Sequence, residues 1–297
     1  MVVCTKIFIS PFLNFGKNHC LYNTFLKKWF GFCIFQVPMK NGFFTFLLLS
    51  FSIFSQEPIE ATFIDKTNLN IDTLVGVDNF NTLYYIKNNV LSKKDDSKTI
   101  TYNNFQLGQI SSFSAFNPLK INLFYKNFNI AIILDNRLAE IFKIDFNTLQ
   151  PYRNVSHIST GNDNTLWLFN QDTQQLEVFD FKNKISLAKT LPIQNVVLDI
   201  KSNYNYCWLL TTQYLFTYNY FGTLISKIKN DGFTSIAESD ENIILKKQNA
   251  LFYLKKNTTQ FIPIITPNLL INQFLLANET LYIYNNETLQ KFQLKTN

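Results

Sequence analysis

A short pattern of apolar and polar positions recurs about six times along the chain. Each copy contains a strand-like stretch, a turn rich in Asn and Asp, a second strand with an apolar or aromatic start, another turn and a third strand. Aligned on the second strand, successive copies are 47, 36, 41, 36 and 38 residues apart. The aligned second strands start at Thr82, Asn129, Thr165, Tyr206, Asn242 and Thr280.

This period is typical of four-stranded blades stacked around an axis. Segments 166–169 and 281–284 are apolar on both alternating faces, so neighbouring layers must cover them on both sides. In the third strand at 176–180, apolar and polar residues alternate more clearly, which fits a position nearer the rim. We therefore predict an all-β fold, a six-bladed β-propeller of four-stranded antiparallel blades. The fourth repeat shows its strands most clearly, at 196–201, 207–211, 214–219 and 223–228.

The two ends of the repeat region predict how the ring closes. The sixth repeat has three strands, the last at 289–294, and an unassigned strand-like segment at 61–65 precedes the first repeat at 73–77. We expect 61–65 to pair beside 289–294 and complete the last blade, which removes an exposed sheet edge. The interval 108–119 is expected to be an enlarged loop between blades.

The first 55 residues differ from the rest of the chain. They contain no Asp or Glu, and their five lysines supply nearly all of the net charge of +6. The remaining chain is close to neutral, so it offers no basic surface for a phosphate backbone. Nucleic-acid binding is not expected.

A targeting segment is predicted within this region. The short basic stretch Met39–Asn41 precedes an apolar run that ends at Ser55. The run is too short to cross a bilayer core of roughly 30 Å, but it suits a signal peptide. We predict a leader outside the folded protein at 1–38, a signal peptide at 39–55 cleaved between Ser55 and Gln56, and a propeller at 56–297. A membrane anchor around 25–54 and an organelle transit peptide are the alternatives.

Cleavage at that point leaves one cysteine, Cys207, so no internal disulfide is possible. Cys207 occupies a position where other repeats carry Leu or Ile, and we expect a small buried apolar group. One repeat position carries the large aromatic residues. They can form platforms for carbohydrate, but a buried second strand favours packing between blades. These residues are Tyr84, Trp167, Trp208 and Tyr282.

Candidate chemistry is sparse. His157 is the only histidine after the predicted cleavage site, on an expected inner strand, and a zinc site of the usual type needs further His or Cys ligands. Acidic residues on or after inner strands could hold Ca²⁺ or act as acid and base on a sugar. Turn formation through Asx side-chain bonds explains the same positions. Candidates at the channel mouth are His157, Asp163, Asp199 and Asp240; further acids there are Asp78, Glu238 and Glu279. No catalytic residue, metal ligand set or cofactor is predicted.

These repeats resemble exported bacterial β-propellers of the WD40-like and quinoprotein-like superfamily. The leader at Met39–Gln56 is similar to signal peptides of Bacteroidota-type envelope proteins. The resemblance covers 39–297 and implies the fold and export. The Gly-His and Trp-Asp signatures of WD40 repeats and the adjacent cysteines of some quinone-dependent dehydrogenases are absent, so it leaves the activity open.

The function expected from these features is that of a periplasmic or secreted, monomeric, non-enzymatic scaffold. It would bind a protein or a cell-envelope component through a propeller face. A channel-end enzyme is the alternative, a hydrolase or lyase acting on a glycan or a small ester with a Ca²⁺ site. A ligand-sensing domain is a third hypothesis, since propellers host many functions.

Overall fold

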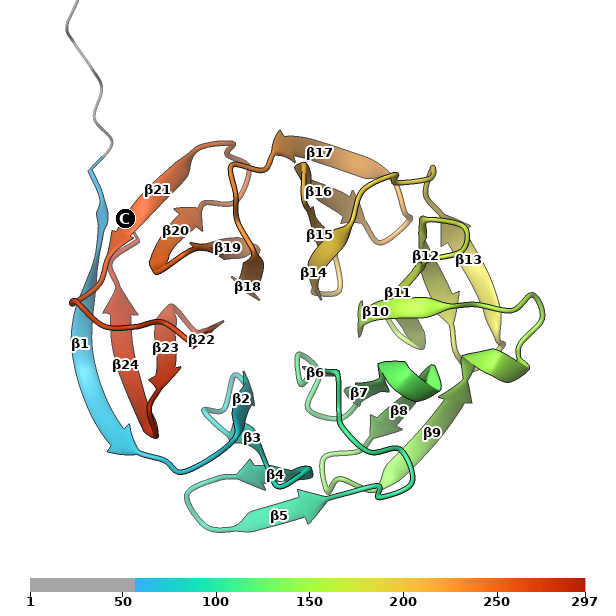
Figure 1. The fold of residues 1–297 in the computed structure, drawn as a ribbon, viewed down its shortest axis with the longest axis horizontal. Coiled ribbons are helices and arrows are strands. Elements are labelled where there is room, and N and C mark those ends of the chain that lie inside the picture. Colours follow the sequence, from blue (N-terminus) through green and yellow to red (C-terminus); the bar gives the residue numbers. More distant parts are fainter. Residues whose placement is uncertain (1–56, 297) are drawn as a thin grey trace, which may run out of the picture. The chain divides into compact units, whose positions relative to one another are not determined.

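A computed structural model describes residues 57–296 of the 297-residue chain. The predicted leader, the signal peptide and the cleavage site between Ser55 and Gln56 lie outside the described residues. Strands β1 to β24 and two short 3₁₀ helices, η1 (Lys126–Phe128) and η2 (Phe146–Thr148), make up the regular structure of 57–296 (Figure 1). In this part of the chain, no helix is long and apolar enough to cross a membrane.

Sixteen consecutive strands form four antiparallel sheets of four strands each (Figure 1). The first two sheets contain β2 (Thr73–Val77), β3 (Leu83–Lys87), β4 (Val90–Lys94) and β5 (Thr99–Tyr102), then β6 (Ser112–Ser114), β7 (Ile121–Tyr125), β8 (Ile130–Leu134) and β9 (Glu140–Asp145). The next two contain β10 (Val155–Thr160), β11 (Thr165–Asn170), β12 (Gln175–Asp180) and β13 (Ile185–Lys189), then β14 (Val197–Ser202), β15 (Tyr206–Thr211), β16 (Tyr214–Asn219) and β17 (Leu224–Lys229).

The remaining strands form one eight-stranded sheet in the order β18-β19-β20-β21-β1-β24-β23-β22. Its strands are β18 (Ser235–Ser239), β19 (Asn242–Lys247), β20 (Ala250–Leu254), β21 (Phe261–Ile265), β22 (Gln273–Ala277), β23 (Thr280–Asn285), β24 (Thr288–Leu294) and β1 (Ile59–Asn68).

Strand β1 joins the two halves of this sheet because it is ten residues long. Its first two residues, Ile59 and Glu60, pair in parallel with β21. From Ala61 onward it pairs antiparallel with β24, starting opposite Leu294. The predicted pairing of 61–65 beside 289–294 is therefore confirmed.

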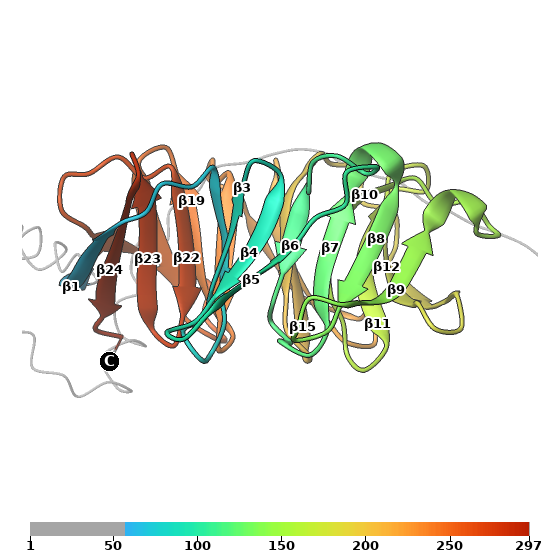
Figure 2. The same ribbon diagram turned by 90° about the horizontal axis from the view of Figure 1, so that it is seen from below.

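The sheets of 57–296 are arranged as in a propeller. In Figure 1 the strands β2, β6, β10, β14, β18 and β22 lie nearest the centre, and β5, β9, β13 and β17 lie at the rim. Figure 2 shows β6, β10 and β22 running between the two faces of the ring. The prediction of an all-β fold with four-stranded antiparallel sheets in a propeller arrangement is confirmed for these residues.

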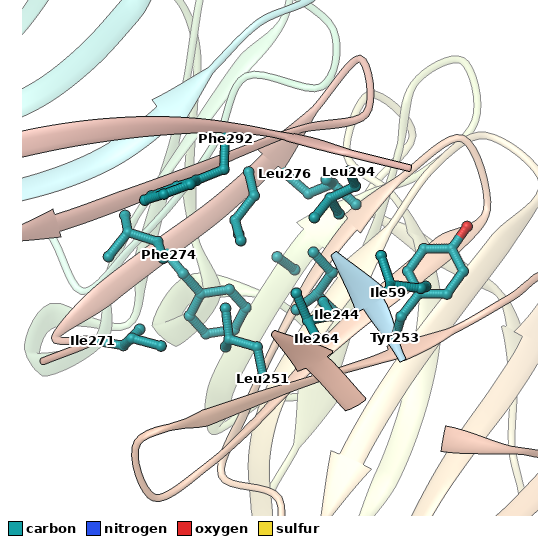
Figure 3. Packing of buried hydrophobic residues seen from close by; sticks show 13 residues of the cluster. Ile59, Ile244, Leu251, Tyr253, Ile264, Ile271, Phe274, Leu276, Phe292 and Leu294 are labelled. Carbon is teal, nitrogen blue, oxygen red and sulfur yellow. The ribbon is translucent and has the colours of Figure 1, made fainter. Parts of the chain in front are cut away.

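The core lies between the sheets, in clusters of buried apolar side chains. Ile59 of β1 packs with Ile264 of β21 and Leu294 of β24, which Figure 3 shows from close by. The aromatic residues of the shared repeat position are all buried, as expected: Tyr84, Trp167, Trp208 and Tyr282. Cys207 is fully buried in one of these clusters, also as expected.

The second repeat corrects our alignment. Of the segment Asn129–Ile132, which we expected in the second strand, Asn129 follows η1 and the other three residues begin the third strand β8, whereas the second strand is β7. Both strands are wholly buried, so apolarity does not distinguish them, and β7 contains the polar Asn122. Its amide Nδ2 donates to Thr160 Oγ1 at 2.8 Å. The expected loop at 108–119 contains the three-residue inner strand β6.

The third strand of the next sheet, β12, is also more buried than its alternation of apolar and polar residues predicted. Glu177 of β12 has no exposed surface. Its Oε2 accepts a hydrogen bond from Arg153 Nε at 3.0 Å and another from Ser186 Oγ, and its Oε1 accepts from Asn170 Nδ2 at 3.3 Å. Arg153 is buried as well, with its guanidinium 4.8 Å from the Phe179 ring centroid. A charged pair inside a sheet-to-sheet contact is stable only with such additional partners.

Gly76 of β2 permits the first two sheets to pack. A Cβ at this position would lie 2.6 Å from Cε1 of Phe113, whose ring contacts Tyr84 at a centroid distance of 5.2 Å. We expect Gly76→Ala to lower the free energy of unfolding by about 1–3 kcal/mol, because the aromatic ring must move out of a packed position. Chemical denaturation measures this change. Phe113→Leu in the same chain should reduce the cost of Gly76→Ala, and equal costs in both backgrounds would contradict this packing argument.

Candidate functional site

The inner strands surround a central cavity of about 520 Å³, which is within the size range of small-molecule sites. Its wall includes residues of β2, β6, β10, β14, β18 and β22. Turns precede and follow these strands, and polar residues of the turns therefore lie around the two ends of the cavity. Serines are common in the wall: Ser111, Ser112, Ser114, Ser159, Ser202, Ser235 and Ser239.

Several of these hydroxyl groups bond to one another across neighbouring sheets. Ser202 Oγ donates to the backbone carbonyl of Thr160 and lies 2.7 Å from Ser159 Oγ, whose hydroxyl can donate to it. Thr160 Oγ1 lies 2.9 Å from Ser114 Oγ and also accepts from Asn122. Side-chain hydrogen bonds thus connect the inner strands β6, β10 and β14. The hydroxyl groups named here already have hydrogen-bond partners within the protein.

Side chains and backbone amides connect the other inner strands. Asp199 Oδ2 of β14 accepts from the Ile236 amide of β18 at 2.9 Å. Gln273 Oε1 of β22 accepts from the Leu74 amide of β2 at 2.8 Å. Both bonds satisfy inner-strand N–H groups that have no ladder partner on the cavity side.

His157 lies in the cavity wall on β10, as the repeat pattern predicted. Its Nδ1 is 2.9 Å from Ser156 Oγ. Burial, together with the positive charges of Lys126 and Lys201, lowers the pKa of His157 to about 4, against the opposing effect of Asp199. The imidazole is therefore neutral at physiological pH and can accept or donate one hydrogen bond to a ligand.

Glu238, at the end of β18, is the most strongly perturbed carboxyl group of the cavity wall. Its Oε1 accepts from Asn203 Nδ2 at 2.9 Å and from the Glu241 amide at 3.0 Å. Burial raises the pKa of Glu238 to about 7, with a contribution from the negative charges of Asp240 and Glu241. A carboxyl group that is half protonated near neutral pH can exchange a proton with a ligand. Its inner-strand position was visible in the sequence, but its burial was not.

The two turn aspartates of the candidate set are exposed. Asp163 and Asp240 both adopt left-handed backbone conformations, with φ of 52° and 51°. Asp240 lies at the edge of the cavity, whereas Asp163 does not line it, and its backbone carbonyl accepts a hydrogen bond from Lys120 Nζ. Both positions fit the alternative interpretation of these acids as turn residues.

The structure does not bring the four candidates together. His157 and Asp199 interact electrostatically, so they share one level of the cavity. Asp240 follows Ile236, whose amide donates to the Asp199 side chain, by four residues, which places it about 13 Å further along the chain, just beyond the end of β18, at roughly 3.3 Å per residue. Within 57–296, no group of three or more His, Cys, Asp or Glu residues could hold a metal ion.

An aromatic pair lies beside the cavity at the Glu238 level. Phe116, from the turn after β6, meets Tyr204, from the turn after β14, edge to face at a centroid distance of 4.8 Å. Burial and the charge of Asp163 raise the pKa of Tyr204. Because Tyr204 follows Asn203, which binds Glu238, this end of the cavity combines aromatic, amide and carboxyl groups. The sequence analysis did not single out either aromatic residue.

We expect Glu238→Gln to stabilise the protein above neutral pH. The pKa of Glu238 is raised on folding from an ordinary value near 4.3, so the wild type loses stability as pH rises between about 4 and 7. Glutamine keeps both hydrogen bonds but does not ionise, so the variant should gain roughly 3–4 kcal/mol at pH 8 and nothing at pH 4. Denaturant unfolding at both pH values measures this gain. An equal effect of the substitution at both would contradict the raised pKa.

No family model and no curated protein matches the sequence. Among solved structures, a streptogramin B lyase superposes with a TM-score of 0.54 at 12% identity, covering 79% of this chain and 98% of the other. A catalytically inactive virginiamycin B lyase from Staphylococcus aureus with quinupristin gives 0.54 at 13% identity, covering 80% and 94%. A chain of the mitotic checkpoint complex gives 0.52 at 10% identity, covering 80% and 94%.

These likenesses, at such low identities, concern the fold alone. They agree with the topology of 57–296, in which antiparallel sheets surround a central cavity. The fold defines this part of the chain as a β-propeller.

Proposed function

We propose that this chain is a six-bladed β-propeller that is exported and serves as a non-enzymatic, monomeric scaffold for a protein or a cell-envelope component. The six-blade count treats the eight-stranded sheet as two blades, β18–β21 and β22–β24 with β1. Each half has its own inner strand at the cavity, and only the two residue pairs between β1 and β21 connect them.

The distribution of polar and apolar groups carries this proposal. Many polar side chains of the cavity wall are engaged in bonds between neighbouring inner strands, for example Ser159 with Ser202 and Asp199 with Ile236. At the rim, by contrast, aliphatic side chains point into solvent, among them Ile141, Leu187 and Ile225. Exposed apolar groups on a rigid framework favour docking of a partner.

Export is the part of the proposal that depends on the leader. We expect the mature protein, produced in a Gram-negative host and recovered from the periplasm or the medium, to begin at Gln56. Amino-terminal sequencing measures this directly. A mature protein that retains residues 1–55 in the cytoplasmic fraction would contradict export.

Scaffold function is tested by photo-crosslinking in the cell. A photoreactive amino acid at position 187 on the rim should yield a discrete crosslinked complex. The combined variant His157→Ala, Asp199→Asn and Glu238→Gln should leave that complex intact. If the cavity variant loses the complex while its circular dichroism spectrum shows an unchanged fold, the partner binds in the channel and not at the rim.

A channel enzyme, a hydrolase or lyase acting on a glycan or small ester with a Ca²⁺ site, is the second candidate. The observation in its favour is the pKa of Glu238, near 7 in a ligand-sized cavity. Turnover of acetylated glycans or p-nitrophenyl esters that rises with Ca²⁺ and is lost in Glu238→Gln would support it. The neighbouring structures include both a lyase and a multiprotein complex, so the fold favours neither candidate.

A further inference from the structure

One end of the central cavity combines aromatic and carboxyl side chains. Asn203 Nδ2, just beyond β14, donates to Glu238 Oε1 of β18 at 2.9 Å, which holds the ends of these two inner strands at one level. Phe116 lines the cavity from the corresponding turn after β6. We call this region the Phe116 end of the cavity. The acidic residues that line it are Asp78, Glu238 and Asp240.

The aromatic pair at this end leaves ring faces free. Phe116 and Tyr204 meet edge to face at a centroid distance of 4.8 Å, a contact that uses the edge of one ring and a single face of the other. Phe116 is half-buried and Tyr204 is 41% exposed, so neither ring is enclosed by the protein. The faces of aromatic rings carry partial negative charge and attract cations.

Glu238 has a carboxyl oxygen that is available to a ligand. Both of its hydrogen bonds, from Asn203 and from the Glu241 amide, end on Oε1. The Asp78 carboxylate, by contrast, accepts three bonds from its own segment through both oxygens. Oε2 of Glu238 therefore remains for a hydrogen-bond donor that enters the cavity.

Two lysines beside β14 and β18 are paired with other carboxylates. Lys201 Nζ lies 3.5 Å from Asp199 Oδ1, and Lys256 Nζ lies 2.7 Å from Glu241 Oε2. Lys201 is the only lysine that lines the cavity within 57–296. Burial and neighbouring negative charges raise the pKa of Glu238, as expected for a carboxyl group that lacks a cationic partner. A cleft with an excess of negative charge attracts cationic ligands.

We propose that the Phe116 end of the cavity binds a small organic cation with an ammonium group. The ammonium charge pairs with Glu238, and its carbon substituents pack on the ring of Phe116. A cavity of about 520 Å³ has room for such a molecule. The inference goes beyond the proposed scaffold function, and it concerns binding without turnover, so it does not depend on the channel enzyme either.

Ligand-observed NMR with the full chain and choline tests the proposal. The matched probe is 3,3-dimethylbutan-1-ol, which has the shape of choline without its charge. The measurement is made at pH 8, above the pKa of Glu238 of about 7. We expect choline to bind at least roughly tenfold more tightly than the uncharged probe, because the carboxylate and the ring faces both favour the charge.

Two variants separate the contribution of charge from that of packing. Glu238→Gln keeps the hydrogen bonds on Oε1 but removes the charge, so it should reduce the preference for choline over the uncharged probe at least about fivefold. Phe116→Ala should weaken the binding of both probes, because both pack on the ring. If Phe116→Ala fails to fold, Tyr204→Ala, at the partly exposed partner of that ring, should weaken both probes in the same way.

The matched control is Glu287→Gln. Glu287, like Glu241, lies in a left-handed turn, with φ of 57°, but it does not line the cavity. This substitution removes the same charge from the protein as Glu238→Gln does. It should change the affinity for either probe by less than about twofold, since an exposed charge outside the cavity is screened by solvent.

Four results would overturn the inference. These are no saturable binding of choline, equal affinities of choline and the uncharged probe, an unchanged preference for choline in Glu238→Gln, and an equal loss of that preference in Glu287→Gln. Crosslinking at position 187 tests the scaffold separately. Choline binding without a crosslinked partner would support this site and not the scaffold, whereas a crosslinked partner without choline binding would support the scaffold and not this site.

Discussion

Deletion of β1, residues 57–68, is expected to lower the melting temperature of the protein by about 15 °C. The strand forms seven residue pairs with β24 and two with β21, and Ile59 is buried between the two halves of the sheet. At roughly 0.5–1.5 kcal/mol per hydrogen bond and about 2 kcal/mol for the buried side chain, the loss is of order 5 kcal/mol. Each kcal/mol shifts the melting temperature of a domain this large by about 2–4 °C.

The missing strand, added as a separate peptide, should restore the stability that the deletion variant has lost. A synthetic peptide with the sequence of residues 57–68, added to the deletion variant, should raise its melting temperature in a saturable manner. A peptide with Asp in place of Ile59 should not, because that side chain enters the core. In the intact chain, Ile64→Asp is the control, since Ile64 is an exposed bulge residue of the same strand. A deletion variant as stable as the wild type would show that β1 does not close the ring.

The closing strand β1 was predictable because its strand-like pattern is visible in a short segment and only one sheet edge, that of the last repeat, was left for it to pair with. Residues 61–65 alternate as a strand does, and the last repeat lacked its outer strand. The error in the second repeat has a physical cause. Strand β6 has only three residues, and β7 contains the buried Asn122, so neither resembles its counterparts in other repeats. The structure identifies both through pairing across the sheet, which a single sequence does not contain.

The candidate site was predicted less completely. The turn position of Asp78 follows from its neighbours, and its Oδ1 accepts from the amides of Phe80 and Thr82 as an Asx turn requires. The raised pKa of Glu238 depends on burial and on the charges of Asp240 and Glu241 around a left-handed turn. The meeting of Phe116 and Tyr204 joins two sheets that are not adjacent in the chain. These properties arise from the closed ring, so no local pattern predicts them.

Arg153→Ala is expected to lower the free energy of unfolding by about 3 kcal/mol at pH 7, because it removes the buried charge partner of the Glu177 carboxylate and leaves only the exposed Lys189, whose Nζ lies 3.9 Å from Glu177 Oε1. Ser186 and Asn170 would still donate to Glu177, but neither is charged. Urea unfolding measures the change. Arg153→Met combined with Glu177→Leu should recover much of the loss, since apolar side chains can replace a buried ion pair at little cost. Arg137→Ala, at an exposed arginine 3.7 Å from Asp135, is the control and should leave the urea midpoint unchanged.

The pH dependence distinguishes lost charge pairing from lost packing. Burial alone would raise the pKa of Glu177, but hydrogen bonds from Ser186, Arg153 and Asn170, together with the charge of Lys189, outweigh it and lower the pKa. A lowered pKa in the folded state means that the carboxylate stabilises the protein above its unfolded pKa, near 4.3, and that this contribution disappears as pH falls through the folded value. The stability difference between wild type and Glu177→Gln should therefore be constant above about pH 5 and shrink below about pH 4. A difference that does not change between pH 7 and pH 3 would assign the effect to packing, and Arg153 would then act through its contact with Phe179 rather than through its charge.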